Sequence, residues 1–80
     1  MFYVYILYSE AVDKFYIGMT SNLEERLKKH NSKSKGFTNQ AKDWKHVFVE
    51  SYTTKSEALI REKEIKSWKS RKKLVALIQK

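Results

Sequence analysis

The residues of this chain that could do chemistry are tyrosines, an arginine and a histidine that lie close together in the sequence. Two tripeptides contain tyrosine, Tyr3-Val4-Tyr5 and Tyr16-Ile17-Gly18, and Arg26 and His30 follow soon after them. An arginine can neutralise charge on a phosphate, and a phenol or an imidazole can orient or deprotonate a water molecule. Because a free phenol has a pKa of about 10, a tyrosine base needs cations nearby. In a strongly basic chain, these residue types indicate chemistry on a phosphate group.

The elements that must position these residues follow from the spacing of the apolar residues and from helix caps. Three strands are predicted, at residues 2–8, 14–18 and 44–52. Three helices are predicted, at residues 21–31, 54–69 and from 70 onward. The first two strands are expected to form an antiparallel hairpin through a turn at 9–13. The order predicts one β-β-α-β-α-α domain of the α+β class over residues 1–80.

Local signals predict where several elements begin and end. Ser21-Asn22-Leu23-Glu24 and Thr54-Lys55-Ser56-Glu57 both have the spacing of a capping box, so a helix is predicted to begin at each. Ser70 can cap the last helix. Gly18 is predicted to end the second strand, at a point where the backbone needs a positive φ or approaches a ligand closely.

The first helix carries two polar residues on the stripe that should face the core. Leu23 and Leu27 fit an apolar stripe, and Arg26 and His30 share its spacing. A buried charge is costly unless it is paired or lies at a wet cleft, so the helix is predicted to border a site. The alternative is that Arg26 extends its charge to solvent while His30 bonds a backbone carbonyl.

A carboxylate interrupts an apolar row on the second helix in the same way. Glu62 shares one face with Ala58 and Ile65. It could hold a hard cation such as Mg²⁺, which needs only one or two protein oxygens besides phosphate and water. The alternative is a salt bridge with Lys66 or Arg61 on a solvated face.

The composition is strongly basic, with 17 Lys and Arg against 9 Asp and Glu and a net charge of +8. This balance favours a polyanionic partner, with nucleic acid ahead of an anionic membrane surface. The chain has no cysteine, no apolar run of membrane-spanning length and no signal-peptide pattern at its N-terminus. We therefore expect a cytoplasmic protein that does not bind membranes. Trp44 and Trp68 are assigned to the core or to a partner interface.

Taken together, the motifs resemble those of the GIY-YIG nuclease family over nearly the whole chain. The family's two tripeptide motifs fall on Tyr3-Val4-Tyr5 and Tyr16-Ile17-Gly18. Its helix arginine falls on Arg26, and the histidine that follows falls on His30. Its metal-binding glutamate falls on Glu62. Ten residues separate Tyr5 from Tyr16, as is usual in the family. The segment Gly36-Phe37-Thr38 and the tail rich in Arg and Lys after Glu62 are similar to those of the small stand-alone bacterial members.

The resemblance implies a three-stranded antiparallel sheet flanked by helices, which hydrolyses DNA phosphodiester bonds with one divalent ion, Mg²⁺ or Mn²⁺. Tyr16, together with Tyr5, would orient or deprotonate the attacking water. Arg26 would stabilise charge on the scissile phosphate, and His30 would assist proton transfer or contact the phosphate. Glu62 would hold the metal against the leaving oxygen.

Nucleic acid is expected to be bound without base reading, because basic side chains neutralise phosphates and release counterions whatever the sequence. The residues predicted to contact it are Tyr3, Gly18, Thr38, Lys66, Lys69, Arg71, Lys72 and Lys73. The polar residues from Asn31 to Asp43 predict a loop. Phe37 is expected to anchor this loop or, alternatively, to stack on an unpaired base. The basic residues could instead form only a solvated helical face.

Three departures from the family pattern bear on activity. Tyr3 stands in place of the first motif glycine, and no asparagine after Asn39 can supply the late asparagine of some members. The third departure is that no separate DNA-binding domain is expected. A homodimer or a partner protein could therefore supply specificity. The leading prediction is a DNA endonuclease of repair, recombination or processing, with RNA left open as a substrate. The alternatives are a catalytically weak nucleic-acid-binding module of the same fold and an interaction protein whose basic tail binds an acidic partner.

Overall fold

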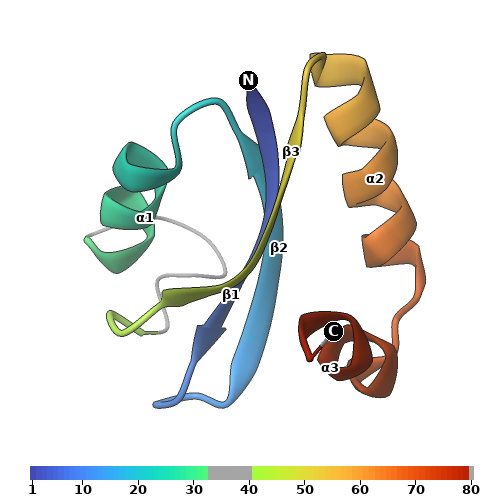
Figure 1. Ribbon diagram of the computed structural model, residues 1–80. Helices are drawn as coiled ribbons and strands as arrows, with labels where there is room; N and C mark the ends of the chain where they lie inside the picture. Colours follow the sequence, from blue (N-terminus) through green and yellow to red (C-terminus); the bar gives the residue numbers. More distant parts are fainter. Residues whose placement is uncertain (33–40, 80) are drawn as a thin grey trace.

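A three-stranded antiparallel sheet separates the helices into two layers in the computed structural model, which describes residues 1–32 and 41–79 (Figure 1). The strands, in the spatial order β2-β1-β3, are β1 (Phe2–Ser9), β2 (Lys14–Thr20) and β3 (Lys45–Tyr52). The helices are α1 (Leu23–Asn31), α2 (Lys55–Ser67) and α3 (Arg71–Ile78). Helix α1 lies on one side of the sheet, and α2 and α3 lie on the other. The predicted element order and fold class are confirmed.

The central strand β1 contributes to a separate apolar core on each face of the sheet. Val4 and Ile6 pack in the core beneath α2 and α3, whereas Tyr5 and Leu7 pack in the core on the α1 side. All four side chains are almost completely buried. Because successive residues of a strand point to opposite faces, a strand covered on both sides needs the unbroken apolar run that the sequence has.

The helix caps agree with the sequence at two of three sites. Thr54 and Ser70 cap α2 and α3 as predicted, each side chain accepting a hydrogen bond from a backbone N–H in the first turn. Helix α1 begins one residue later than predicted, because Asn22, rather than Ser21, accepts the hydrogen bond from the backbone N–H of Glu25 at 3.1 Å. Glu24 and Glu25 are both available as the third residue of the cap, so the sequence pattern allows either register.

The pairing of β1 with β3 contains a β-bulge. Ile6 is opposite Phe48 and Leu7 is opposite His46, so Val47 has no partner of its own on β1. Val47 and Phe48 both pack against the core beneath α2 and α3. Residues on the N-terminal side of the bulge are therefore shifted by one position, and the side chain of His46 joins that of Leu7 on the α1 face.

Two side-chain bridges fix the start of β3. The amide of Asn31, at the end of α1, donates to the carbonyl of Trp44 at 2.9 Å and accepts from its backbone N–H at 2.8 Å. The Asp43 carboxylate accepts hydrogen bonds from the Ser9 hydroxyl and the Ala11 backbone N–H, at 2.5 and 3.0 Å. Together these bonds hold the segment before β3 against α1 and the end of β1.

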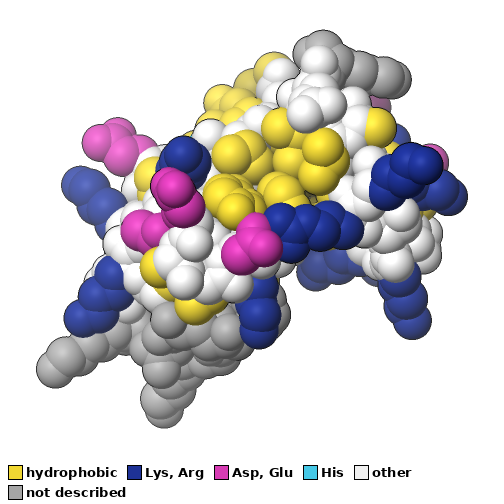
Figure 2. Space-filling model, turned by 90° about the horizontal axis from the view of Figure 1, so that it is seen from below, with side chains coloured by type: hydrophobic (Ala, Val, Ile, Leu, Met, Phe, Trp, Pro, Cys, Tyr) yellow, Lys and Arg dark blue, Asp and Glu magenta, His cyan; other side chains and the backbone are white. Residues whose placement is uncertain are grey.

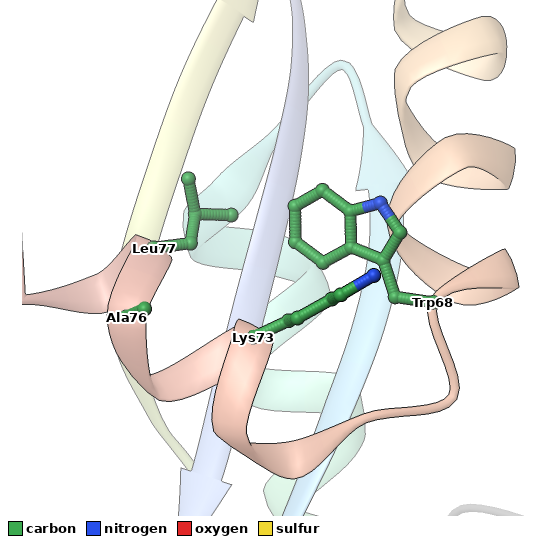
Figure 3. A pocket seen from close by; sticks show the side chains of 4 residues that line it. All are labelled: Trp68, Lys73, Ala76 and Leu77. Carbon is green, nitrogen blue, oxygen red and sulfur yellow. The ribbon is translucent and has the colours of Figure 1, made fainter.

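Helix α3 covers the lower end of the sheet and leaves apolar surface beside it. A shallow groove between α3 and the hairpin is lined by Tyr8, Phe15, Val47, Arg71, Val75, Ile78 and Gln79. Figure 2 shows hydrophobic side chains gathered on this end of the molecule, with charged side chains around them. A second hollow lies where α3 follows α2, between the Trp68 indole and the side chains of Lys73, Ala76 and Leu77 (Figure 3).

We expect Asn31→Ala to lower the free energy of unfolding by about 2 kcal/mol, because two backbone groups of a buried tryptophan lose their partner. Chemical denaturation of the wild type and the variant would measure the difference. Ser32→Ala is the matched control, since its exposed hydroxyl donates to the carbonyl of Lys29 in the preceding turn. Equal, small effects of the two substitutions would show that the Asn31 bridge contributes little.

Candidate active site

Tyr5 is the centre of a cluster of rings contributed by four elements. Its ring is 6.3 Å from that of Tyr16 on β2 and 5.7 Å from that of His46 on β3, measured between centroids. Its hydroxyl is hydrogen-bonded to Nε2 of His30 on α1 at 2.9 Å. The ring of Tyr16 is also 4.8 Å from that of His30. Tyr5 of the first motif, Tyr16 of the second motif and His30 of the helix therefore meet at one place.

Gly18 makes room for the phenol of Tyr5. The two residues are opposite each other in the β1–β2 pairing. A Cβ atom at position 18 would lie 2.4 Å from the Tyr5 hydroxyl oxygen and 3.0 Å from Cε2 of Tyr16. The prediction that Gly18 ends the strand is wrong, because β2 continues to Thr20. The close approach that requires a glycine is made by the side chain of Tyr5.

Burial keeps the Tyr5 phenol protonated. Desolvation raises the pKa of Tyr5 to about 12, although the neighbouring Arg26 acts in the opposite direction. Cations near the phenol therefore do not make Tyr5 a phenolate at neutral pH. Tyr5 can instead donate its proton when a second proton replaces it on the phenol oxygen.

His30 is suited to accept a proton. It is only 6% exposed, and burial together with the positive charges of Arg26 and His46 lowers its pKa below the ordinary value of 6.5. Its imidazole is therefore neutral at pH 7 and bonded through Nε2 to Tyr5. Of the alternative considered for the first helix, the exposed Arg26 agrees, whereas His30 is bonded to the Tyr5 hydroxyl. That this helix borders a site stays a prediction.

Arg26 supplies a permanent positive charge at the rim of the cluster. The residue is exposed, and its interaction with the Tyr5 hydroxyl raises its pKa further. An exposed guanidinium next to a buried phenol can contact a phosphate that approaches from solvent.

Glu62 reaches the cluster electrostatically from α2. Its charge is one of the influences that raise the pKa of Tyr5. Its side chain is 15% exposed and forms an ion pair with Lys66 at 3.3 Å. The salt bridge considered as the alternative is therefore present, but the carboxylate is largely buried and does not lie on a solvated face.

The donor set fits a metal only if the substrate completes the coordination. Within residues 1–32 and 41–79 no group of three or more His, Cys, Asp or Glu side chains could hold a metal ion. Mg²⁺ is commonly bound through one or two carboxylates together with phosphate oxygens and water. Glu62 fits such a site, with the ammonium group of Lys66 as the competing cation.

The predicted nucleic-acid contacts are spread over both layers. Tyr3 is opposite Thr20 and Ser51 and lies on the same face as Tyr5. Lys69, Arg71, Lys72 and Lys73 lie in and before α3, on the other side of the sheet. Arg71 is paired with Asp13, and Lys66 with Glu62. Phe37 and Thr38 lie outside the described residues.

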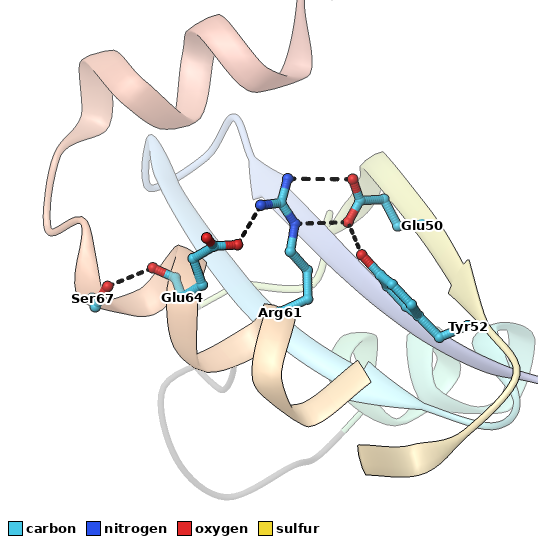
Figure 4. A network of polar contacts seen from close by, with 5 residues as sticks. All are labelled: Glu50, Tyr52, Arg61, Glu64 and Ser67. Atoms are coloured by element: carbon cyan, nitrogen blue, oxygen red, sulfur yellow. Dashed lines mark hydrogen bonds and ion pairs between the residues drawn. The ribbon is translucent and has the colours of Figure 1, made fainter. Parts of the chain in front are cut away.

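Arg61, another cation of α2, is held in a network that attaches this helix to β3 (Figure 4). Its guanidinium donates to Glu50 at 2.9 Å and to Glu64 at 2.5 Å, and Glu50 also accepts from the Tyr52 hydroxyl. Arg61 therefore has a structural role in the described part of the chain.

His46 is the neighbour of Tyr5 that sequence reasoning did not find. A regular strand over 44–52 would place His46 on the same face as Phe48 and Glu50, towards α2. The bulge at Val47 reverses its direction. A bulge of this type has no clear mark in the local sequence, so only its context in the sheet could have revealed it.

The fold and this constellation define a GIY-YIG module, and a family model described as the GIY-YIG catalytic domain matches residues 1–74. The chain belongs to this family, whose members are endonucleases. No solved structure matches the chain significantly. No helix in the described part is long and apolar enough to cross a membrane.

Similar proteins of nearly the same length carry the name UPF0213. One from Staphylococcus haemolyticus is 37% identical over 73 residues, which are 90% of this chain and 88% of the relative. Another, from Syntrophus aciditrophicus, is 40% identical over 80 residues, or 96% of this chain and 90% of the relative. A third, from Staphylococcus epidermidis, is 42% identical over 60 residues, or 74% and 73%. These names state no reaction.

We expect Gly18→Ala to destabilise the protein by about 1–3 kcal/mol, since the added methyl group overlaps the Tyr5 phenol. In a Tyr5→Leu background the same substitution should cost much less, because the overlapping atoms are gone. Denaturation of the four proteins gives the coupling between the two positions. Equal costs in both backgrounds would mean that the Tyr5 side chain is not the reason for the glycine.

Proposed function

We propose that the protein is a metal-dependent endonuclease that hydrolyses DNA phosphodiester bonds in repair, recombination or processing. The observation that carries the proposal is the hydrogen bond between the Tyr5 hydroxyl and Nε2 of His30, with Arg26 beside it. Family membership adds the class of reaction. The basic net charge of +8 supports nucleic acid as the partner.

The pair can move a proton away from the attacking water. A water bound to the Tyr5 hydroxyl gives its proton to the phenol oxygen while the phenol proton passes to Nε2 of His30. The resulting hydroxide attacks phosphorus, and the bond from phosphorus to the leaving oxygen breaks. This relay uses Tyr5 as a neutral phenol, in agreement with its raised pKa, and His30 as a neutral base. Tyr16, which lies against both rings, would orient the water.

Charge that develops on the phosphate is neutralised from two sides. Arg26 is exposed and permanently cationic, so it can bind the non-bridging oxygens as negative charge accumulates. Glu62, with phosphate oxygens and water, would hold Mg²⁺ or Mn²⁺, and the ion would supply Lewis-acid stabilisation of the leaving oxygen. The ammonium group of Lys66, which is paired with Oε2 of Glu62, would compete with the ion for this carboxylate.

Substrate selection is proposed to depend on the shape of the nucleic acid. Lys69, Lys72 and Lys73 are exposed and could contact phosphates, but they lie on the opposite side of the sheet from Tyr5. A nucleic acid that touched both regions would have to pass around an edge of the sheet. A bent, nicked or flapped DNA does this more easily than a straight duplex.

The second candidate function is a binding module of the same fold that cuts little. The ion pair between Glu62 and Lys66 favours it, because the carboxylate is already neutralised by a cation of its own helix. Such a protein would bind nucleic acid in the absence of divalent metal and would not gain activity when metal is added.

The relay predicts a definite dependence of the cleavage rate on pH. The rate should fall as pH decreases through the pKa of His30, which lies below 6.5, because protonated His30 cannot accept the proton. No decrease should occur on the alkaline side near pH 9, since the pKa of Tyr5 is about 12. Single-turnover rates between pH 5 and pH 9 would test both limbs. A His30→Gln protein that kept the acidic limb would refute the relay.

We expect Glu62→Gln to lower metal-dependent cleavage by at least about a hundredfold while DNA binding in EDTA is retained. The assay uses labelled linear, nicked, flapped and single-stranded DNA with Mg²⁺, Mn²⁺ or EDTA. Glu64→Gln is the matched control, because the same change is made two residues away on the exposed side of α2. Full activity of Glu62→Gln would remove Glu62 as the ligand, and no cleavage by the wild type would favour the binding module.

A further inference from the structure

We propose that His46 is a further substrate-binding residue of the site, whose imidazole donates a hydrogen bond to a phosphate oxygen of the nucleic acid. The inference rests on the proposed function, since it assigns the ligand of the same site. It concerns a residue of β3 that is outside the motifs of the chain.

The position of His46 is set by the β-bulge. With regular pairing from Ile6 and Phe48 onward, His46 would be opposite Tyr8 and would face α2 and α3. The extra residue, Val47, places His46 opposite Leu7, whose other neighbour across the sheet is Tyr16 on β2. Tyr16, Leu7 and His46 therefore form one row on the α1 face, and bulges often redirect a side chain in this way beside active sites.

The surroundings of His46 suit a ligand contact better than a core position. Its ring lies against that of Tyr5 on the β3 side, with centroids 5.7 Å apart. The residue is only partly buried. In the part of the chain that the structure describes, its two ring nitrogens make no hydrogen bond. An imidazole that packs one side against a reacting residue, and whose nitrogens make no hydrogen bond in the described part of the chain, can donate to a ligand that binds there.

The charge around His46 favours an anion. The titratable and charged groups of the described residues near this region are Tyr5 on β1, Tyr16 on β2, and Arg26 and His30 on α1. The carboxylate of Glu62 acts on Tyr5 as well, but from the opposite layer. Arg26 is permanently cationic, and burial raises the pKa of Tyr5, so that its phenol carries no charge at neutral pH. A phosphate that contacted Arg26 would thus meet a second donor, His46, which lies on the β3 side of Tyr5. The two donors would fix the phosphorus above the Tyr5 hydroxyl.

The alternative explanation is that His46 only fills space against the Tyr5 ring. His46→Phe tests this, because it keeps an aromatic ring of similar width and removes both nitrogens. His46→Gln is the complementary variant, since it keeps a hydrogen-bond donor without the ring. If His46 binds phosphate, His46→Phe should raise KM and lower kcat/KM about tenfold at pH 7, and His46→Gln should recover part of the loss. Wild-type kinetics in His46→Phe would overturn the proposal.

A binding measurement separates this inference from the proposed activity. The chain has two histidines, so the imidazole Cε1–Hε1 NMR signals are assigned by comparing the wild type with His46→Phe. A short nicked DNA is added in EDTA, where no metal-dependent cleavage occurs. We expect the His46 signal to shift with the bound fraction, and the affinity of His46→Phe to fall by several-fold. DNA binding without a shift at His46 would refute the contact, whether or not the protein cleaves DNA when metal is present.

Discussion

The hydrogen bond between the Tyr5 hydroxyl and His30 is the interaction on which the arrangement of the site depends. It joins the central strand to α1, and both groups are almost completely buried. The phenol can occupy that position only because the residue opposite on β2 is Gly18. The hydrogen bond between Tyr5 and His30 and the absence of a side chain at Gly18 therefore define where the sheet and the helix meet. The same burial sets the protonation of both partners, a neutral phenol and a neutral imidazole.

The two helical layers on either side of the sheet differ in the residues that they hold. The α2 and α3 layer holds the larger aliphatic core and carries Glu62, while the α1 layer holds the aromatic cluster. Glu62 influences Tyr5 through charge from the opposite layer. In a chain of 80 residues, such a division lets the residues that stabilise the fold be largely separate from those proposed to act on the substrate.

Most of the fold could be predicted, because its signals are local. The apolar run of β1, the caps Thr54 and Ser70 and the helical stripes each depend on neighbours in sequence. The meeting of Tyr5, Tyr16 and His30 was also predictable from the motifs. The reason for Gly18 and the direction of His46 were not, since both depend on which residue lies across the sheet. A cross-strand contact and a one-residue bulge are properties of the pairing between strands and are only weakly marked in either strand alone.

The paired bonds between Asn31 and Trp44 have a consequence for the connection that joins α1 to β3. They fasten its two ends to each other through a single side-chain amide. The closure entropy of a loop grows only logarithmically, by about 0.6 kcal/mol for each doubling in length. A change in the length of this connection should therefore cost little free energy of unfolding, and it would be made directly after His30 and Asn31 in the sequence. Variation in substrate choice could arise there without any change in the sheet.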